Sequence, residues 1–344
     1  MNGQLNNCRW DVHHLDDDLK RKLLSDFKGV RDGFIQVGPK KYFLTKGFAE
    51  DDMKYATFKP RSTDVWIVTF PRSGTTWTQE MVWLVCNNLD YKKAADVSLL
   101  ERFPFLEFSS CVSKSILDEF LEEAESDDVK ENLKKACGPI FKELDDMTER
   151  RFIKSHLPFS LLPHDLLTCG AKVIYVARNP KDVCVSFYNF HKFIKTLDYV
   201  SDFKTFWNYF QQGNILWTPY WSHLAEAWEL RKNKNLLFVF YEDMKSNLHE
   251  SIKKVCNFLQ KEYGEDEIKK LVKHLEFDNF RNNKSVNMEV LRDWGMLLSN
   301  DQKCVRKGTP GSWKNFFDVE LNEQANEWIQ ENLKNTDMRF PECQ

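Results

Sequence analysis

Four short apolar runs along the chain share one pattern, in which a strand-like stretch meets a polar turn and helical spacing follows. The runs are Asp64–Phe70, Arg151–His156, Lys172–Ala177 and Leu236–Tyr241. In the first, third and fourth, β-branched and aromatic residues stand at consecutive positions, which is typical of strands covered on both faces. Strand, turn and helix repeated in this way predict an α/β fold with a central parallel sheet and flanking crossover helices. In such sheets ligands bind at the carboxyl ends of the strands, where these polar turns lie.

The 344 residues show no internal repeat and no linker long enough to separate two domains. We therefore predict a single domain over 1–344, with a peripheral N-terminal segment at 1–40. The segment 113–150 is acidic and helix-prone, and it contains one Gly and one Pro. It is interpreted as a solvated helical insertion, or alternatively as a lid beside the substrate cavity, because long insertions in α/β enzymes often cover the site.

Composition narrows the class of protein. With 49 basic and 52 acidic residues, the net charge of −3 does not favour a nucleic-acid partner, which usually requires a strongly basic face. No apolar stretch approaches the roughly 20 residues of a membrane helix, and the N-terminus lacks the apolar core of a signal peptide. The nine cysteines include no C-x-x-C pair. We expect a soluble, cytoplasmic protein without a metal site and without a membrane partner.

The turn after the first run reads Pro-Arg-Ser-Gly-Thr-Thr-Trp, from Pro71 to Trp77. A tight turn at Gly74 can aim successive backbone N–H groups at one point, and the following helix adds a partial positive charge. Thr75 and Thr76 supply hydroxyl donors and Arg72 supplies a full charge. The pattern predicts a P-loop-like site for one phosphate or sulfate group. An ordinary capped helix start is the alternative.

Two further turns carry cations. Arg178 follows the third run, and Ser186 stands eight residues later, so the turn must fold back for the two to share a second phosphate. Near the C-terminus, Arg306 and Lys307 stand beside Gly308. That group is interpreted as a phosphate clamp, with a charged surface loop as the alternative.

The second run ends in Lys154-Ser155-His156, and Pro158 stops it. Lys154 and His156 are two residues apart and therefore lie on the same face of a strand. A histidine just past a strand end is where general bases often lie. A satisfied structural histidine is the alternative.

Together these elements closely resemble the cytosolic sulfotransferases that use 3'-phosphoadenosine 5'-phosphosulfate (PAPS). The family pattern P-K-S-G-T-T-W has its counterpart in the first turn, and the similarity runs from about residue 40 to the C-terminus, with the motifs in family order. The other motifs are Lys154–Pro158, Tyr175–Val183, Tyr241–Asp243 and Arg306–Asn315. The sequence Gly38-Pro39-Lys40, the P-R-S-G-T-T form and the acidic insertion look most like insect members, which include a retinol dehydratase.

The resemblance implies a role for each matching residue. His156 would take the proton from an acceptor hydroxyl, and Lys154 and Arg72 would neutralise growing charge on the transferring group and the leaving phosphate. Trp77 and Phe277 would enclose the adenine, with Tyr241 at its polar edge. The 5'-phosphosulfate would be held by Arg72, Ser73, Gly74, Thr75 and Thr76, and the 3'-phosphate by Arg178, Ser186, Arg306, Lys307 and Gly308. PAPS would be the donor and its desulfated product, 3'-phosphoadenosine 5'-phosphate (PAP), would leave.

The acceptor implied by the resemblance is a small, largely apolar alcohol or phenol, such as a steroid or a retinoid. Candidate pocket residues by position are Phe105, Phe190 and Met288, each of which could equally be plain core. The acceptor's identity does not follow from the sequence. Sulfation and dehydration of an allylic alcohol through a transient sulfate ester use the same nucleotide and base, so both stay open.

Several positions depart from the family pattern. Arg72 replaces the usual lysine and brings a planar fork in place of a compact ammonium. Leu275 stands where many relatives place a threonine near the adenine. The family's dimer signature survives in spacing as Lys314, Val319 and Glu323, although an aspartate replaces its threonine. We expect a homodimer through these residues.

Two other classes of protein were weighed. A P-loop kinase is disfavoured because Gly74 is not followed by the lysine of that motif and no Mg²⁺-binding strand end is visible. A nucleotide-binding relative without catalysis is disfavoured because Lys154 and His156 are both present.

Overall fold

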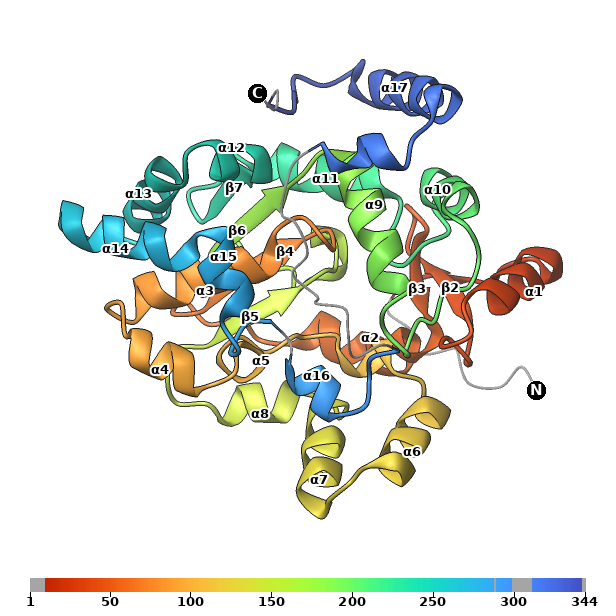
Figure 1. Cartoon of the computed structure of the whole chain (residues 1–344), viewed down its shortest axis with the longest axis horizontal. Helices are drawn as coiled ribbons and strands as arrows, with labels where there is room; N and C mark the ends of the chain where they lie inside the picture. The colour runs from red at the N-terminus through yellow and green to blue at the C-terminus, as the bar shows by residue number, and fades with distance from the viewer. Residues whose placement is uncertain (1–9, 288, 299–310, 342–344) are drawn as a thin grey trace.

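The central sheet consists of four parallel strands: β4 (Val65–Thr69), β5 (Phe152–Ser155), β6 (Lys172–Ala177) and β7 (Leu236–Phe240). Their order is β5-β4-β6-β7 in the computed structural model, which describes residues 10–287, 289–298 and 311–341 (Figure 1). Each strand falls within one of the four predicted runs. The predicted parallel sheet with flanking helices is therefore confirmed.

Alternation along the strands assigns their side chains to two separate cores. In β4, Trp66 and Val68 belong to one hydrophobic cluster, and Val65 and Ile67 belong to the other. All four side chains are at most 2% exposed. Since side chains alternate across a strand, the two clusters lie on opposite faces of the sheet, and the strands are covered on both faces as predicted.

Helices cover each face. The face of Val65 packs against α3 (Thr75–Cys86), α13 (Leu248–Phe258) and α14 (Glu265–Leu275). The face of Trp66 packs against α9 (Pro180–His191), α10 (Phe203–Gln212) and α11 (Tyr220–Leu230). The shorter helices on these connections are α4 (Tyr91–Asp96), α5 (Leu99–Arg102), η1 (Ser109–Cys111), η2 (Phe159–Leu161), α12 (Tyr241–Ser246), α15 (Phe277–Asn282) and α16 (Glu289–Asp293).

The N-terminal part of the chain forms a second, antiparallel sheet of β1 (Val12–His13), β2 (Phe34–Val37) and β3 (Tyr42–Thr45). Helix α1 (Asp17–Asp26) precedes β2, and α2 (Lys46–Thr57) follows β3. Phe34 and Ile35 are buried in the larger hydrophobic cluster, so side chains of the segment 1–40 contribute to the core. The apolar side chains of this segment pack against the core, although the segment lies near the chain terminus.

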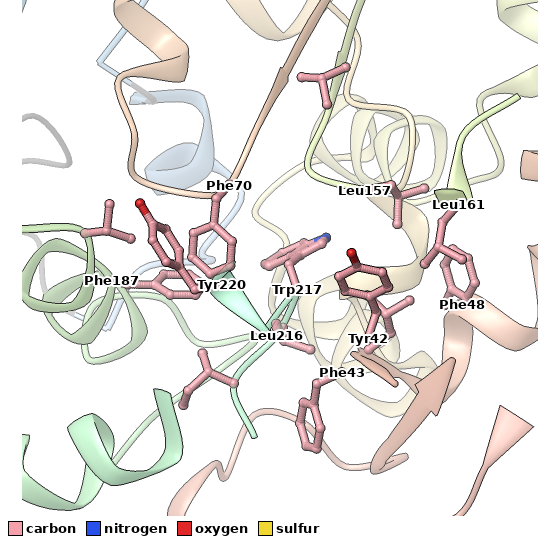
Figure 2. Close-up of a cluster of buried hydrophobic side chains, with 14 of the residues drawn as sticks. Tyr42, Phe43, Phe48, Phe70, Leu157, Leu161, Phe187, Leu216, Trp217 and Tyr220 are labelled. Carbon is pink, nitrogen blue, oxygen red and sulfur yellow. The ribbon is translucent and has the colours of Figure 1, made fainter. Parts of the chain in front are cut away.

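Residue Phe43 of β3 ties this small sheet to the loop before α11. The Phe43 amide donates to the Thr218 carbonyl at 2.8 Å, and the Trp217 amide donates to the Phe43 carbonyl at 2.7 Å. Trp217 has a left-handed backbone with φ of 66°, which is a rare conformation for a bulky residue. These backbone bonds hold the Trp217 side chain in the cluster of buried hydrophobic side chains that Figure 2 shows.

The acidic segment contains α6 (Lys114–Glu123), α7 (Asp127–Ala136) and α8 (Phe141–Asp146). Its helices are amphipathic, because Ile116, Phe120 and Leu133 are buried while the opposite faces are exposed. Salt bridges join α6 to two other parts of the chain, Arg31 to Glu119 and Lys195 to Glu123. In Figure 1, α6 and α7 lie at the bottom of the view, far from α17 at the top.

The C-terminal part contains η3 (Ser312–Asn315) and α17 (Val319–Leu333). Asp182 of α9 accepts hydrogen bonds from the amides of Gly311 (2.9 Å) and Trp313 (3.4 Å). The Asp318 side chain caps α17 by accepting from the Leu321 amide. None of the helices in the described ranges has the length and apolarity needed to span a bilayer.

Candidate active site

The turn after β4 has the conformation that an anion-binding loop requires. Gly74 has φ of 101°, and a Cβ atom placed on it would lie 2.6 Å from Cδ2 of Tyr241. Only glycine fits there, because this backbone region disfavours side chains and the Tyr241 ring occupies the space. Helix α3 begins at the next residue, Thr75. The loop therefore presents a helix N-terminus to the cavity that Gly74 and Thr75 line.

Two arginines converge beside this loop. Arg178 Nη1 donates to the Arg72 carbonyl at 3.0 Å, and Arg72 Nε donates to Ser186 Oγ at 3.1 Å. The Arg178 guanidinium also lies 4.3 Å from the ring centroid of Tyr241. Arg72, which the resemblance assigns to the 5'-phosphosulfate, thus lies next to Arg178 and Ser186, which it assigns to the 3'-phosphate. Asn179 caps α9 and Pro180 begins it, so Arg178 precedes the helix that carries Ser186, and both residues line the cavity.

Buried polar atoms in this region make the site suitable for an anionic ligand. Within the described part of the chain, Ser73 Oγ and Arg178 Nε are buried and make no hydrogen bond. Buried donors of this kind are normally satisfied in a working protein. Arg178 lines the cavity, so a phosphate or sulfate oxygen bound there would satisfy its Nε, and the residues present fit a nucleotide that carries such groups.

His156 is held in one tautomer. Its Nδ1 lies 2.8 Å from the Thr69 carbonyl oxygen, which can only accept, so Nδ1 carries the proton. Nε2 is then the unprotonated nitrogen, and the residue lines the cavity. Burial, and next the positive charge of Lys154, hold the pKa of His156 well below its usual 6.5. The neutral, proton-accepting imidazole is therefore the favoured form at neutral pH.

A second histidine holds the main chain of the first. His223 Nε2 donates to the His156 carbonyl at 2.9 Å, and Tyr175 OH lies 2.7 Å from His223 Nδ1. His223 and Tyr175 are fully buried. Because Nε2 of His223 donates, its Nδ1 must accept from the tyrosine hydroxyl, and burial lowers the pKa of His223. His223 was not singled out from the sequence, and Tyr175 was named only as the first residue of a motif, without a role.

Lys154 is buried beside His156. Its Nζ lies 4.1 Å from the centroid of the Phe105 ring, and that ring lies 5.1 Å from the His156 ring. The two residues share one side of β5, as their spacing predicts. The arrangement places a cation and a base on the same wall of the cavity.

The cavity has a volume of about 340 Å³ and two chemically different parts. The polar part contains the Arg72–Thr76 loop, Arg178 and Ser186. Beside the polar part lie Trp77, Tyr241 and Phe277, the residues that the family resemblance assigns to the adenine ring. Trp77 Nε1 donates to the Leu275 backbone carbonyl at 2.9 Å, so this contact does not depend on the side chain at position 275.

The other part of the cavity is lined by aromatic and aliphatic side chains. Phe105 and Phe190 are among them, as predicted from position, and the Phe190 ring also lies 5.0 Å from the Arg72 guanidinium. Met288, Arg306, Lys307 and Gly308 lie outside the described residues. Sequence reasoning missed the remaining apolar lining, which includes Leu100, Phe108, Phe187, Ile194, Trp217 and Leu291.

An aromatic cluster behind the cavity fixes its central part. The Trp217 ring lies 5.3 Å from the His156 ring and 6.2 Å from the Phe187 ring, between centroids. Phe70, at the end of β4, packs edge-on against Phe187 at 5.8 Å and Tyr220 at 5.0 Å (Figure 2). The cluster joins residues from four segments that are remote in sequence. That distance explains why no local pattern identified them.

A phosphate-type loop with its cation before the glycine, a tautomer-locked histidine and an apolar chamber together define a class of enzyme. The chain belongs to the sulfotransferase family: the model described as "Sulfotransferase domain" matches residues 62–337. It is a PAPS-dependent sulfotransferase, as the resemblance of its motifs implied.

Individual relatives agree with this membership. The chain is 33% identical to luciferin sulfotransferase of Photinus pyralis, over 87% of this chain and 80% of that protein. It is also 33% identical to sulfotransferase 1E1 of Homo sapiens, over 85% of this chain and 92% of that protein. The crystal structure of a retinol dehydratase in complex with retinol and PAP superposes with a TM-score of 0.90 at 34% identity, covering 97% of this chain and 99% of the other.

Proposed function

We propose that the polar part of the cavity binds PAPS, with the phosphosulfate on the Arg72–Thr76 loop and the 3'-phosphate on Arg178 and Ser186. The buried Nε of Arg178, a residue that lines the cavity, supports this placement, because it needs an acceptor oxygen. Arg306, Lys307 and Gly308 would complete the 3'-phosphate site on the basis of their motif. Trp77 and Phe277 would contact the adenine on its faces, and Tyr241 would lie at its edge.

His156 is proposed as the general base. The observation that carries this proposal is the hydrogen bond from Nδ1 to the Thr69 carbonyl, since it leaves Nε2 able to accept the proton of an acceptor hydroxyl. PAPS supplies the electrophilic sulfur. Lys154 and Arg72 would stabilise the negative charge that develops as the sulfonyl group moves in line.

The proposed acceptor is a small and largely apolar alcohol or phenol. Phe105, Phe108, Trp217 and Leu291 form a chamber with little to bind polar substituents, so burial of apolar surface would dominate acceptor affinity. The hydroxyl that reacts would face His156, the base on the wall that Phe105 also lines.

Dehydration of an allylic alcohol is the second candidate. It is favoured by the TM-score of 0.90 to a retinol dehydratase solved with retinol. In that reaction the sulfate ester forms first, and the C–O bond then breaks, giving inorganic sulfate, a proton and a conjugated polyene. Sulfation alone would leave the ester intact, so the products separate the two functions.

We also propose a homodimer through Lys314, Val319 and Glu323. Val319 begins α17 with a side chain that is 76% exposed, so it is accessible to a second copy of the chain. Sedimentation would test this, because Val319→Glu should shift a dimer to monomer.

The test of the main function uses ³⁵S-labelled PAPS and a panel of phenols, steroids, retinoids and fatty alcohols, followed by mass spectrometry of the products. We expect sulfate esters of apolar alcohols, or a desulfated polyene with retinol. The absence of both a sulfate ester and a desulfated polyene with every acceptor, in a protein that binds PAP tightly, would contradict both candidate functions.

A further inference from the structure

Glu107 is a buried carboxylate on the segment that joins α5 to η1. The segment runs beside the edge strand β5, because the Lys154 amide donates to the Pro104 carbonyl at 2.8 Å and the Leu106 amide donates to the Lys154 carbonyl at 2.9 Å. These two bonds form a short parallel bridge between Phe105 and Lys154. Backbone pairing stops there, at the point where β5 reaches Ser155 and His156.

The Glu107 side chain continues this pairing where the backbone does not. Oε1 accepts from the His156 amide at 2.5 Å, and Oε2 accepts from Ser155 Oγ at 2.9 Å. Ser155 Oγ in turn accepts from the Leu157 amide at 3.0 Å. One carboxylate therefore orders three consecutive residues around His156. Hydrogen bonds to an ionised acceptor are stronger than neutral ones.

The same segment carries part of the acceptor chamber. Phe105 and Phe108 flank Glu107 in sequence and line the cavity, and the Phe105 ring contacts both His156 and Lys154. A displacement of Glu107 would therefore move the base and the chamber wall relative to one another. Misplacement of reacting groups by about 1 Å can lower a rate by roughly 100-fold.

Burying this carboxylate is costly for the fold. Glu107 is 1% exposed, and burial raises its pKa to about 7, although the bonds from His156 and Ser155 and the charge of Lys154 oppose the rise. Tyr55 and Cys111 are further titratable groups that interact with it. A carboxylate can be retained in the interior, despite the free-energy cost of desolvation, where it holds neighbouring groups in a fixed geometry.

We propose that Glu107 is a positioning residue, which holds the main chain of His156 and aligns the base with the Phe105–Phe108 wall. The proposal rests on the proposed role of His156 as general base. Glu107 itself does not line the cavity, so its effect on the reaction is transmitted through the residues it binds.

The experiment compares Glu107→Ala and Glu107→Gln with Asp26→Ala. Asp26 is a matched control, since it is also a buried carboxylate that accepts two hydroxyl bonds, from Ser201 and Tyr209 at 2.6 Å each, and it does not line the cavity. All assays are run well below the melting temperature of each variant. We expect Glu107→Ala to lower kcat by about 10- to 100-fold and to raise the acceptor KM. PAP affinity by calorimetry should stay within about twofold.

Glu107→Gln keeps one acceptor oxygen for the His156 amide, so it should recover most of the lost kcat. Asp26→Ala should lower the melting temperature and leave kcat near the wild-type value. If Glu107→Ala and Asp26→Ala lower kcat equally, or if both Glu107 variants keep wild-type kcat, the positioning role is wrong. Should Glu107→Ala not fold, Glu107→Gln decides, because it keeps one acceptor oxygen but loses the charge: a kcat below that of Asp26→Ala supports the positioning role, and a kcat equal to it contradicts the role.

Hydrogen exchange at the His156 amide separates this proposal from the proposed function. Loss of the Glu107 acceptor should accelerate exchange of that amide in folded protein, whether or not His156 is the base. Accelerated exchange with unchanged kcat would mean that the contact exists but does not serve catalysis, and the base assignment itself is tested separately by His156→Ala. Unchanged exchange in a folded Glu107→Ala variant would overturn the positioning role itself.

Discussion

Thr69 contacts His156 through its backbone and the phosphate-type loop through its side chain. The Thr69 carbonyl accepts from His156 Nδ1 at 2.8 Å, and the Thr69 hydroxyl lies 2.7 Å from Thr75 Oγ1. One residue at the end of β4 therefore links the proposed base to the first turn of α3. In the proposed reaction the acceptor hydroxyl and the donor meet between these two groups, so their relative position would be set by a rigid strand end.

Replacing His156 should remove the chemical step and spare donor binding. We expect His156→Ala to lower kcat by roughly 100- to 10,000-fold, the usual contribution of a general base. The fold should persist, because the hydrogen bonds from the residue 156 amide to Glu107 and from His223 to the residue 156 carbonyl involve only the main chain at that position. Steady-state kinetics and PAP titration measure the two effects. Turnover within tenfold of wild type would contradict the base assignment.

The pH dependence of kcat/KM should show no loss of activity around pH 6.5. A histidine whose pKa is depressed stays neutral as the pH falls through 6.5 and is protonated only at lower pH. The acidic limb of the profile should therefore lie clearly below pH 6.5. Glu107, with a pKa of about 7, is the other group that titrates nearby. An acidic limb at pH 6.5 to 7 that survives in Glu107→Gln would contradict the depressed pKa of His156.

Gly74→Ala should abolish donor binding, and a second glycine provides its control. Both Gly74 and Gly295 have left-handed φ values, of 101° and 69°, so alanine strains either backbone. At Gly74 the new Cβ would lie 2.6 Å from the Tyr241 ring, whereas at Gly295 nothing lies within 4 Å among the described residues. We expect PAP affinity to fall by more than about tenfold for Gly74→Ala only. Equal losses in the two variants would show that backbone strain alone is responsible.

Arg72→Lys tests the departure from the family motif. Lysine would keep the charge and lose the Nε bond to Ser186 at 3.1 Å. We expect PAPS affinity to fall about three- to tenfold and kcat to stay within tenfold, because a compact ammonium can still neutralise the leaving phosphate. Arg72→Met, which removes the charge, should lower kcat much further. Similar kcat values for the two variants would remove Arg72 from the chemistry.

The sequence was informative where the signal is local. The Val65–Thr69 and Lys172–Ala177 strands are uninterrupted apolar runs, and the turn at Gly74 has a residue requirement that only glycine meets. The strands Phe34–Val37 and Tyr42–Thr45 were missed because each has four residues and forms its register only by pairing with the other.

Long-range contacts explain the other omissions. Trp217 lies 61 positions from His156 in sequence, yet their rings pack at 5.3 Å. His223 and Glu107 contact His156 through its main chain, for which a sequence gives no signal. Such contacts form only in the folded structure, so the pattern of neighbouring positions in the sequence cannot identify the residues that make them.

The pairing of Phe43 with Trp217 has an evolutionary consequence. A hairpin of β2 and β3 holds Trp217, which lines the cavity, through backbone bonds, and none of the hairpin's own residues lines the cavity. Insertions or substitutions in that hairpin can shift the tryptophan without replacing any residue that lines the cavity. A change of acceptor range can thus arise from the N-terminal sheet without a change in the residues proposed to bind the donor.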